Sequence, residues 1–293
     1  MDPQNSYSLS VVIATLGGPS LPQTIQSLNS GLVVPDEIII SIPEAEAQSN
    51  RYLEAGNVKV LSVKCRGQVA QRCEGFKEAR GKYVLQIDDD IIVDKECLFK
   101  LIKASETLGT NSALSPALYF LKSNESVYNL PVKSNLISKI FYSLINGKKG
   151  YCEGAITLSG TEIGINPDNH KGSAINTEWV PGGVVLHCHQ NLITNNYYPH
   201  TGKAYSEDLY HSVELTKKGI ELYVVPDAIA WIDDPRLDGL PAPQFWYKNL
   251  KKDYNARLYL VKMTGRSVLR MKVFYLISSF AYSIKYARKL WRG

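Results

Sequence analysis

Three consecutive carboxylates interrupt an apolar stretch in the first third of the chain. Asp88, Asp89 and Asp90 follow the largely apolar run 83–87 and precede the apolar residues 91–93. Three adjacent anions repel one another, and an unpaired charge is costly away from water, so the cluster needs a counter-ion. A divalent cation held by one or two carboxylates meets that need and usually also takes substrate phosphates. The alternative is a solvated acidic turn, which is less favoured because strand ends in open α/β sheets collect ligands.

The elements that must position these aspartates alternate between strands and helices. The apolar, β-branched runs predict buried strands, helical spacing and glycine stops predict the helices, and the alternation indicates a parallel nucleotide-binding sheet. The expected strands are 9–15, 36–41, 58–63 and 83–87, and the expected helices are 21–28 and 68–79.

Beyond residue 95 the periodic pattern is less regular. A helix is expected at 95–108, and the polar segment 116–178 is expected to be an irregular insertion that contains one short helix, 137–145. A glycine turn and a strand follow within 179–192 and a helix within 207–219, after which 220–232 predicts a strand, a Pro-Asp turn and another strand.

Four segments occur in the order found in family-2 glycosyltransferases, which are inverting enzymes of the GT-A fold. They are VVIATLGG, GQVAQRCEGFKEARGKYVLQIDDD, WVPGGVVL and SEDLYHSVELTKKG, and together they span most of residues 9–233. The chain therefore resembles this family. The resemblance implies an α/β fold, with a GT-A-like nucleotide-binding sheet and helices on both faces, followed by a C-terminal amphipathic helical region. It also implies a glycosyltransferase domain over 1–244, with a donor half at about 1–115 and an acceptor half at about 116–244, and a basic tail over 245–293.

The resemblance gives the three aspartates separate roles. Asp88 and Asp90 fall on the family's DxD motif, which holds Mn²⁺ or Mg²⁺ against the donor diphosphate. Alternate residues of a strand point to opposite sides, so Asp89 is expected to turn away from the metal and contact the donor ribose.

Five further residues match the family's donor-binding segments. Thr15 and Gly17 belong to the first loop, which lines the nucleotide, and Arg72 aligns with an arginine near the donor phosphates or uracil. Gly182 and Gly183 match a turn that lets backbone approach the donor sugar. The alternatives are a surface helix residue at Arg72 and ordinary tight turns at the glycines.

Asp208 falls on the family's catalytic carboxylate. A base there removes the acceptor hydroxyl proton, and such help is worth roughly 10²–10⁴ in rate. Trp179, Glu207 and His211 are expected to bind the acceptor. Ser206, Glu207 and Asp208 also fit the start of a helix, and this interpretation is compatible with catalysis by Asp208. The alternatives are a core position for Trp179 and a surface position for His211.

The chain departs from the family pattern at two positions. No aspartate follows the second strand to bind uracil or ribose unless Glu44 replaces it, which weakens the case for UDP. The family's metal-binding histidine is also missing, and Asp233 is the candidate oxygen ligand in its place. His187 and His189 share a strand face but lack the further ligands of a zinc site.

The net charge of +5 conceals an asymmetry. Twelve lysines and arginines stand against one aspartate in 245–293, so this segment carries +11 and the rest of the chain −6. Residues 267–291 have helical apolar spacing, but the uncharged run between Lys272 and Lys285 is too short to span a bilayer. The pattern favours a helix, within 266–292, that lies on an anionic membrane surface. The alternative is a helix packed on the enzyme body or on a second subunit. A nucleic-acid partner is disfavoured because the charge is confined to one end and no recognition motif accompanies it.

The composition is that of a globular protein, with 44% hydrophobic and 21% charged residues. Five scattered cysteines and a polar start without a signal-peptide pattern indicate a reducing cytoplasm. Together these features predict a cytoplasmic enzyme, peripheral at the inner face of the cell membrane.

The expected function is metal-dependent, inverting transfer of a sugar from a nucleotide-diphosphate donor, a UDP-sugar in the first instance, to a glycan hydroxyl. The expected acceptor is lipid-linked, as in the synthesis of surface polysaccharide, O-antigen or capsule. The alternatives are a catalytically degenerate, membrane-associated interaction protein of the same fold, and a sugar-nucleotide pyrophosphorylase. The latter fits less well because the loop after the first strand lacks arginine and lysine.

Overall fold

The computed structural model describes residues 8–128, 135–170, 172, 174–200, 204–234 and 239–292. The chain forms two compact units, each described below by itself. Unit 1 comprises Met1–Asn129 and Ile165–Asp233, and unit 2 comprises Leu130–Gly164 and Asp234–Gly293. The division differs from the domains predicted from the sequence, since 130–164 groups with the C-terminal segment.

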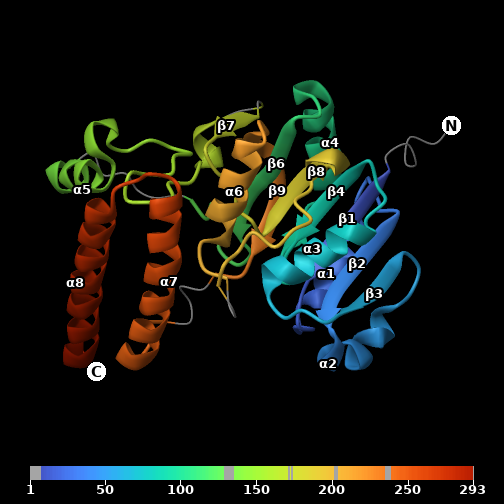
Figure 1. Ribbon diagram of the computed structural model, residues 1–293, viewed down its shortest axis with the longest axis horizontal. Coiled ribbons are helices and arrows are strands. Elements are labelled where there is room, and N and C mark those ends of the chain that lie inside the picture. Colours follow the sequence, from blue (N-terminus) through green and yellow to red (C-terminus); the bar gives the residue numbers. More distant parts are fainter. Residues whose placement is uncertain are drawn as a thin grey trace. The chain divides into compact units, whose positions relative to one another are not determined.

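The predicted strands and helices of unit 1 occur in the predicted order (Figure 1). Three further strands, Ile92–Val93, Ser112–Phe120 and Ile175–Thr177, were not predicted, and the last two enter the segment 116–178 that was expected to be irregular. The strands and α-helices of unit 1 are β1 (Leu9–Ala14), α1 (Leu21–Leu28), β2 (Glu37–Pro43), α2 (Glu44–Ala47), β3 (Val58–Val63), α3 (Gln68–Glu78), β4 (Tyr83–Ile87), β5 (Ile92–Val93), α4 (Cys97–Leu108), β6 (Ser112–Phe120), β7 (Ile175–Thr177), β8 (Val184–Cys188), α6 (Glu207–Lys217) and β9 (Glu221–Ile232).

The sheet of unit 1 has the strand order β3-β2-β1-β4-β8-β6-β9-β5, and β7 pairs with β9. The first four strands are mutually parallel, as predicted: Val11 of β1 lies beside Ile38 of β2 and Leu85 of β4. β8 runs antiparallel to both of its neighbours, so the complete sheet is mixed. The carboxyl ends of β1 and β4 therefore meet at one edge, directly before the three aspartates.

Helices cover both faces of this sheet, because alternate residues of each strand point to opposite sides. Val11 of β1 belongs to a core that includes Leu21 of α1 and Leu101 of α4. The next residue, Val12, packs instead with Phe76 of α3. On a further part of the sheet, β8 packs with Leu215 of α6. The prediction of helices on both faces is confirmed.

One local prediction was wrong. Residues 220–232 were expected to form two strands separated by a Pro-Asp turn, but β9 is a single strand paired with β6 along its length. The pairing shifts between Pro116 and Ala117, whose partners are Val225 and Ile229. The extra residues form a bulge, which accommodates Pro226 because a bulge leaves backbone donors outside the ladder.

Unit 2 is helical and contains α5 (Leu136–Asn146), α7 (Pro243–Met263) and α8 (Val268–Arg292). Val261 of α7 packs with Met271 and Tyr275 of α8. At the centre of the unit, buried Arg257 donates to the Gly160 carbonyl at 2.5 Å and pairs with Glu162 and Asp253. Within the described residues no helix is both long enough and apolar enough to span a membrane.

Candidate active site

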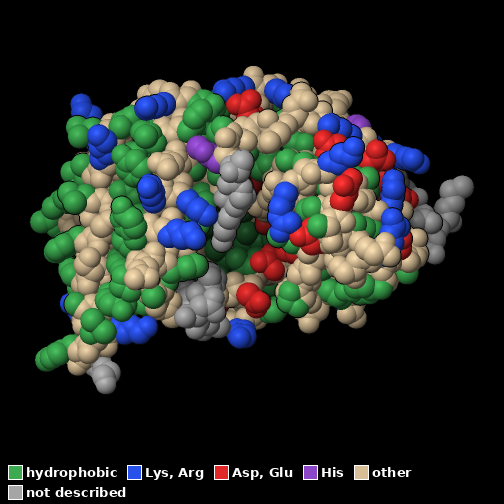
Figure 2. Space-filling view, turned by 60° about the horizontal axis from the view of Figure 1, so that its bottom comes forward, with side chains coloured by type: hydrophobic (Ala, Val, Ile, Leu, Met, Phe, Trp, Pro, Cys, Tyr) green, Lys and Arg blue, Asp and Glu red, His purple; other side chains and the backbone are tan. Residues whose placement is uncertain are grey.

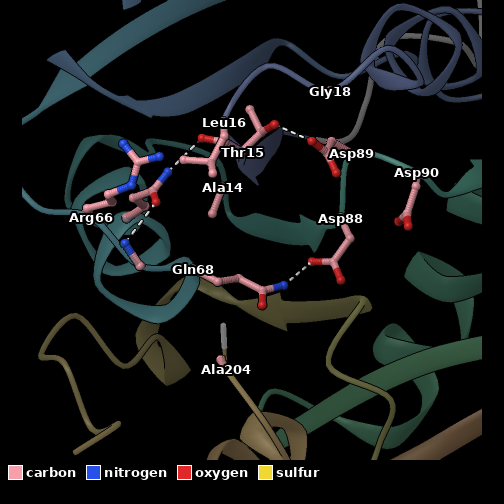
Figure 3. A pocket seen from close by; sticks show the side chains of 12 residues that line it. Ala14, Thr15, Leu16, Gly18, Arg66, Gln68, Asp88, Asp89, Asp90 and Ala204 are labelled. Carbon is pink, nitrogen blue, oxygen red and sulfur yellow. Dashed lines mark hydrogen bonds between the residues drawn. The ribbon is translucent and has the colours of Figure 1, made fainter. Parts of the chain in front are cut away.

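A cavity of about 880 Å³ opens at the carboxyl edge of β1 and β4 (Figure 3). Its lining comes from the loop after β1, the start of α3, the loop after β4 and the segment before α6. These residues are Ala14–Leu16, Gly18, Arg66–Gln68, Gln71, Asp88–Asp90 and Ala204. The predicted site residues Thr15, Asp88, Asp89 and Asp90 thus meet in one cavity.

Asp88 is the most strongly perturbed carboxylate of this cavity. Its Oδ1 accepts hydrogen bonds from Gln68 at 2.9 Å and from Arg72 at 3.2 Å. Burial raises its pKa to about 7; Glu207 and Asp90 add to the rise, while Arg72 and Gln68 oppose it. The side chain keeps 27% exposure, so solutes in the cavity can reach it. Within the described part of the chain Oδ2 accepts no hydrogen bond, which leaves that oxygen for a ligand.

Asp89 is turned toward the first loop and ties it to the end of β4 (Figure 3). The Thr15 hydroxyl donates to Asp89 Oδ2 and accepts from the Gly17 amide at 2.9 Å. A side chain at Gly18 would lie 3.1 Å from the same carboxylate oxygen. Thr24 of α1 completes the connection by donating to the Asp89 carbonyl at 3.0 Å. Asp89 therefore organises the loop that lines the cavity.

The donor set at Asp88 and Asp90 fits a hard divalent cation. Both groups offer carboxylate oxygens, the ligands that Mg²⁺ and Mn²⁺ prefer, and burial with the neighbouring acids Glu207 and Asp90 raises the pKa of Asp88 despite its pairing with Arg72. Among the described residues no three metal-binding side chains converge. The antiparallel ladder pairs Ile92 with Trp231 and Val93 with Ala230. This ladder ends before Asp90, which lies in a turn, and before Asp233, which is exposed, so among the described residues Asp233 does not join the two aspartates.

Arg72 does not line the cavity; its side chain is only 2% exposed. It donates to both carboxylate oxygens of Glu207, at 3.2 and 3.0 Å, and to Asp88. Burial disfavours its charge, but the pairing with Glu207 and Asp88 outweighs that effect, so the pKa of Arg72 lies above its ordinary value. In this structure Arg72 therefore links two carboxylates, and Glu207 is its buried partner. From the sequence, Arg72 was instead expected at the donor and Glu207 at the acceptor.

Asp208 begins the first turn of α6 and is partly exposed. Its Oδ1 accepts from the Leu209 amide at 2.9 Å. The residue before the helix, Ser206, has the left-handed backbone angles φ 53° and ψ 26°, which are uncommon outside glycine and concentrate at functional sites. A strained residue thus sets the direction in which the helix starts.

The two predicted glycines bring the start of α6 close to Asp88. A side chain at Gly182 would lie 2.7 Å from Glu207 Oε1 and 3.1 Å from Asp208 Cβ. At the next residue, Gly183, it would lie 3.3 Å from Asp88 Oδ2, and the Gly183 carbonyl accepts from the Asp88 amide at 2.8 Å. Asp208 and Asp88 therefore lie on either side of one dipeptide, although Asp208 is outside the cavity lining.

Two residues predicted to bind the acceptor are buried. Trp179 is 3% exposed and packs edge-on against Tyr128. His211 is 1% exposed, stacks on Tyr197 and lies 5.2 Å from the ring of His187. Burial, together with His187 and Arg72, lowers the pKa of His211 well below its usual value. Neither side chain presents a polar or aromatic surface to solvent.

The sequence alone missed two glutamines at the start of α3. Gln68 binds Asp88, and buried Gln71 donates to the carbonyls of Thr15 at 2.7 Å and Ser41 at 3.0 Å. Gln71 also accepts from the Gly67 amide at 3.0 Å, so one side chain joins the loop after β1, strand β2 and the start of α3. Both glutamines lie in the family segment that ends at Arg72, and this position could have indicated a role in the site. Glutamine is also an ordinary helix residue, so its type alone does not indicate such a role.

Two solved structures can be compared with this fold. The structure of GalNAc-T7 with UDP, GalNAc and Mn²⁺ matches with a TM-score of 0.56 and 18% identity over 78% of this chain and 44% of that chain. This chain thus spans less than half of that protein. The structure of S. aureus TarS 1–349 matches with a TM-score of 0.48 and 15% identity, over 85% and 65% of the two chains. The likeness to GalNAc-T7 confirms the predicted GT-A fold.

Sequence comparison gives the family. No curated protein sequence matches the chain. The family model described as glycosyl transferase family 2 matches residues 10–158, just over half of the chain, and covers β1 to β6 with the three aspartates. The chain therefore belongs to glycosyl transferase family 2 and is a glycosyltransferase.

Proposed function

We propose that this glycosyltransferase moves a sugar from a nucleotide-diphosphate donor to a hydroxyl of a glycan acceptor, with inversion and with the help of a divalent metal. The observation that carries the proposal is the link through Arg72. It joins Asp88, at the end of β4, to Glu207, which stands beside Asp208 at the start of α6. This link supports the proposal because it connects the proposed metal-binding carboxylate with the segment that carries the proposed base, far apart in the sequence.

The donor occupies the cavity at the end of β1 and β4 in this proposal. Thr15, Gly17 and Asp89 form the loop around the nucleotide, and the Gly182–Gly183 turn lies beside the donor sugar. Arg72 stabilises the site from the protein interior, because it is buried and pairs with Asp88. UDP is the proposed nucleotide, in agreement with the UDP in the GalNAc-T7 structure.

Asp88 and Asp90 would hold Mn²⁺ or Mg²⁺, and Asp233, which follows β9, is the proposed third protein ligand. Such an ion, when bound, neutralises charge that develops on the leaving diphosphate. Gln68 and Arg72 occupy Asp88 Oδ1, so Oδ2 is the oxygen proposed to bind the ion.

Asp208 acts as the general base. It takes the proton of the acceptor hydroxyl, whose oxygen bonds to the anomeric carbon while the bond to the diphosphate breaks on the opposite side. The rigid start of α6, fixed by Ser206 and by the pairing of Glu207, holds the carboxylate in place. Since Trp179 and His211 are buried, their proposed role is to support the acceptor side from within the core.

The proposed acceptor is a lipid-linked glycan of surface polysaccharide, O-antigen or capsule synthesis. This setting follows from the basic, apolar segment 266–292, which suits a protein that is peripheral at the inner face of a cell membrane.

A thermal-shift screen of nucleotide sugars with and without Mn²⁺ tests the donor, because a ligand that binds only the native state raises the Tm. Asp208→Asn should abolish transfer while the donor still raises the Tm, whereas Asp88→Ala should remove the Mn²⁺-dependent part of the shift. Full turnover by Asp208→Asn would refute the assigned base. The absence of any shift and of any turnover in the wild type would favour the degenerate interaction protein.

A further inference from the structure

Helix α8 is apolar on two opposite sides. On one side Met271 and Tyr275 pack against α7. On the other side Leu269, Leu276 and Phe280 are 73%, 71% and 68% exposed. Spacings of seven and four residues keep these three side chains on one face, since consecutive residues of a helix are about 100° apart. The packing of α8 within its unit therefore leaves a complete apolar stripe uncovered in the described structure.

Helix α5 carries a second exposed apolar stripe. Leu136, Ile137, Ile140 and Leu144 have helical spacing and are 72%, 77%, 51% and 42% exposed, whereas Ile145 is buried. Four exposed apolar side chains along one helix face are unfavourable in water unless something covers them. The sequence places this helix in the middle of the chain, far from the tail.

A defined contact joins α5 to α8. Arg270 Nη1 of α8 donates to the carbonyls of Ser143 and Leu144, at 2.7 and 2.6 Å, near the end of α5. Both carbonyls belong to the last turn of α5, where the Ser143 carbonyl also accepts from the Gly147 amide and a cation suits the helix dipole. At the other end, Asn135 accepts from the Ser138 amide at 2.9 Å and caps α5. The two stripes thus belong to one capped and connected helical assembly.

The charge of unit 2 indicates what covers the stripes. Its two segments contain seventeen lysines and arginines against five acids, a net charge of +12. Two of the acids, Glu162 and Asp253, pair with the buried Arg257. The lysines close to α5 and the basic residues near the end of α8 are exposed: Lys139, Lys148, Lys149, Lys285, Arg288 and Lys289. Figure 2 shows Lys and Arg among hydrophobic side chains on the part of the surface that unit 2 forms.

We propose that α5 and α8 together form a single membrane-binding surface, which inserts its apolar side chains at the interface of an anionic bilayer while the surrounding lysines and arginines contact the lipid phosphates. This rests on the proposed function, in which the acceptor is lipid-linked, and it deepens it by adding an internal helix to the membrane contact. A second copy of the chain fits less well, because it carries the same +12 and protein interfaces are depleted in lysine.

The test measures binding of the full chain to vesicles of phosphatidylcholine with phosphatidylglycerol, and to vesicles of phosphatidylcholine alone. Ile137→Ser/Ile140→Ser removes half of the α5 stripe, and Leu276→Ser/Phe280→Ser acts on α8. Each pair should weaken binding to the anionic vesicles at least about tenfold, since apolar burial drives interfacial binding. Lys148→Gln and Lys149→Gln should each weaken it about fivefold, in a salt-dependent manner, as expected for a lysine near an anionic surface.

Leu32→Ser/Val34→Ser is the matched control, because both side chains are 47% exposed but belong to unit 1. It should bind as the wild type does. If the α5 pair binds as the wild type does while the α8 pair is weakened, α5 has no part in the contact and the inference fails. Absence of wild-type binding, or a dimer whose formation depends on these stripes, also overturns it. The nucleotide-sugar thermal shift, measured on the same samples, shows separately whether the proposed transferase function stands.

Discussion

Replacing Arg72 by Met should strongly destabilise the protein, because this arginine compensates two carboxylates at once. It is 2% exposed and makes three charge-assisted hydrogen bonds, two to Glu207 and one to Asp88. Glu207, itself 7% exposed, would keep only the long contact from Tyr197 Oη, at 3.4 Å, among its described hydrogen bonds. Removing one partner of a buried pair typically costs about 3–5 kcal/mol, and Met preserves most of the side-chain volume.

A double-mutant cycle isolates the pair. Glu207→Gln keeps the shape and removes the charge, and should cost less, about 1.5–3 kcal/mol, because Arg72 retains Asp88. Arg72→Met/Glu207→Gln should then cost at least about 2 kcal/mol less than the sum of the single changes, since no buried charge of the pair is left unmatched.

Urea unfolding followed by circular dichroism at pH 7.5 measures these free energies. Glu214→Gln is the control on the same helix, because its pair with Lys217 is exposed and should contribute less than about 0.5 kcal/mol. A cost below about 1 kcal/mol for Arg72→Met, or strict additivity in the cycle, would refute the assignment of Arg72 as a buried link.

Three further predictions concern the same region. Burial and Arg72 lower the pKa of His187 to about 3, and the pKa of His211 is also lowered, so each ring stays neutral in the fold while the unfolded chain takes up a proton below pH 6.5. Each histidine should therefore remove about 1.4 kcal/mol of stability per pH unit below 6.5, whereas Asp88, whose pKa is raised to about 7, takes up a proton in the fold and offsets about one of them; urea midpoints at pH 7.5 and 5.5 should show the net fall. His211→Phe keeps the stacking on Tyr197 and should remove the His211 contribution to this fall, about 1.4 kcal/mol per unit. Gly182→Ala should lower the unfolding free energy by about 1–3 kcal/mol, and lower transfer with it, because the new methyl group would meet Glu207 Oε1 at 2.7 Å; an unchanged Tm would contradict this contact.

The strands and helices around the donor cavity could be predicted from the sequence because local patterns determine them. Apolar runs gave β1 to β4 within about two residues, and the glycine stops placed the ends of α3 and α6 within about two residues. The meeting of Asp88, Asp89 and Thr15 followed from the rule that parallel strands end at one edge.

Local sequence patterns could not predict which residues contact one another in the folded chain. Nothing near Arg72 in the sequence indicates that it lies against Glu207, which is 135 residues away, so a polar helix residue was expected to face solvent or donor. Trp179 and His211 were likewise placed at the acceptor, because residue type alone does not show burial. The same limitation explains β9, where Pro226 indicated a turn but pairing with β6 maintains one strand with a bulge.

The discontinuous make-up of unit 2 has a consequence for how the chain is synthesised. Arg270 contacts Ser143 across 127 residues and Arg257 contacts Gly160 across 97, so the segment 135–164 leaves the ribosome long before its partners. Until α7 and α8 follow, α5 lacks the arginine that holds its end. A protein shortened at residue 244 would therefore lose more than a tail, since it would keep an apolar helix without its support. Such a truncation is expected to aggregate even though every element of the donor cavity is retained.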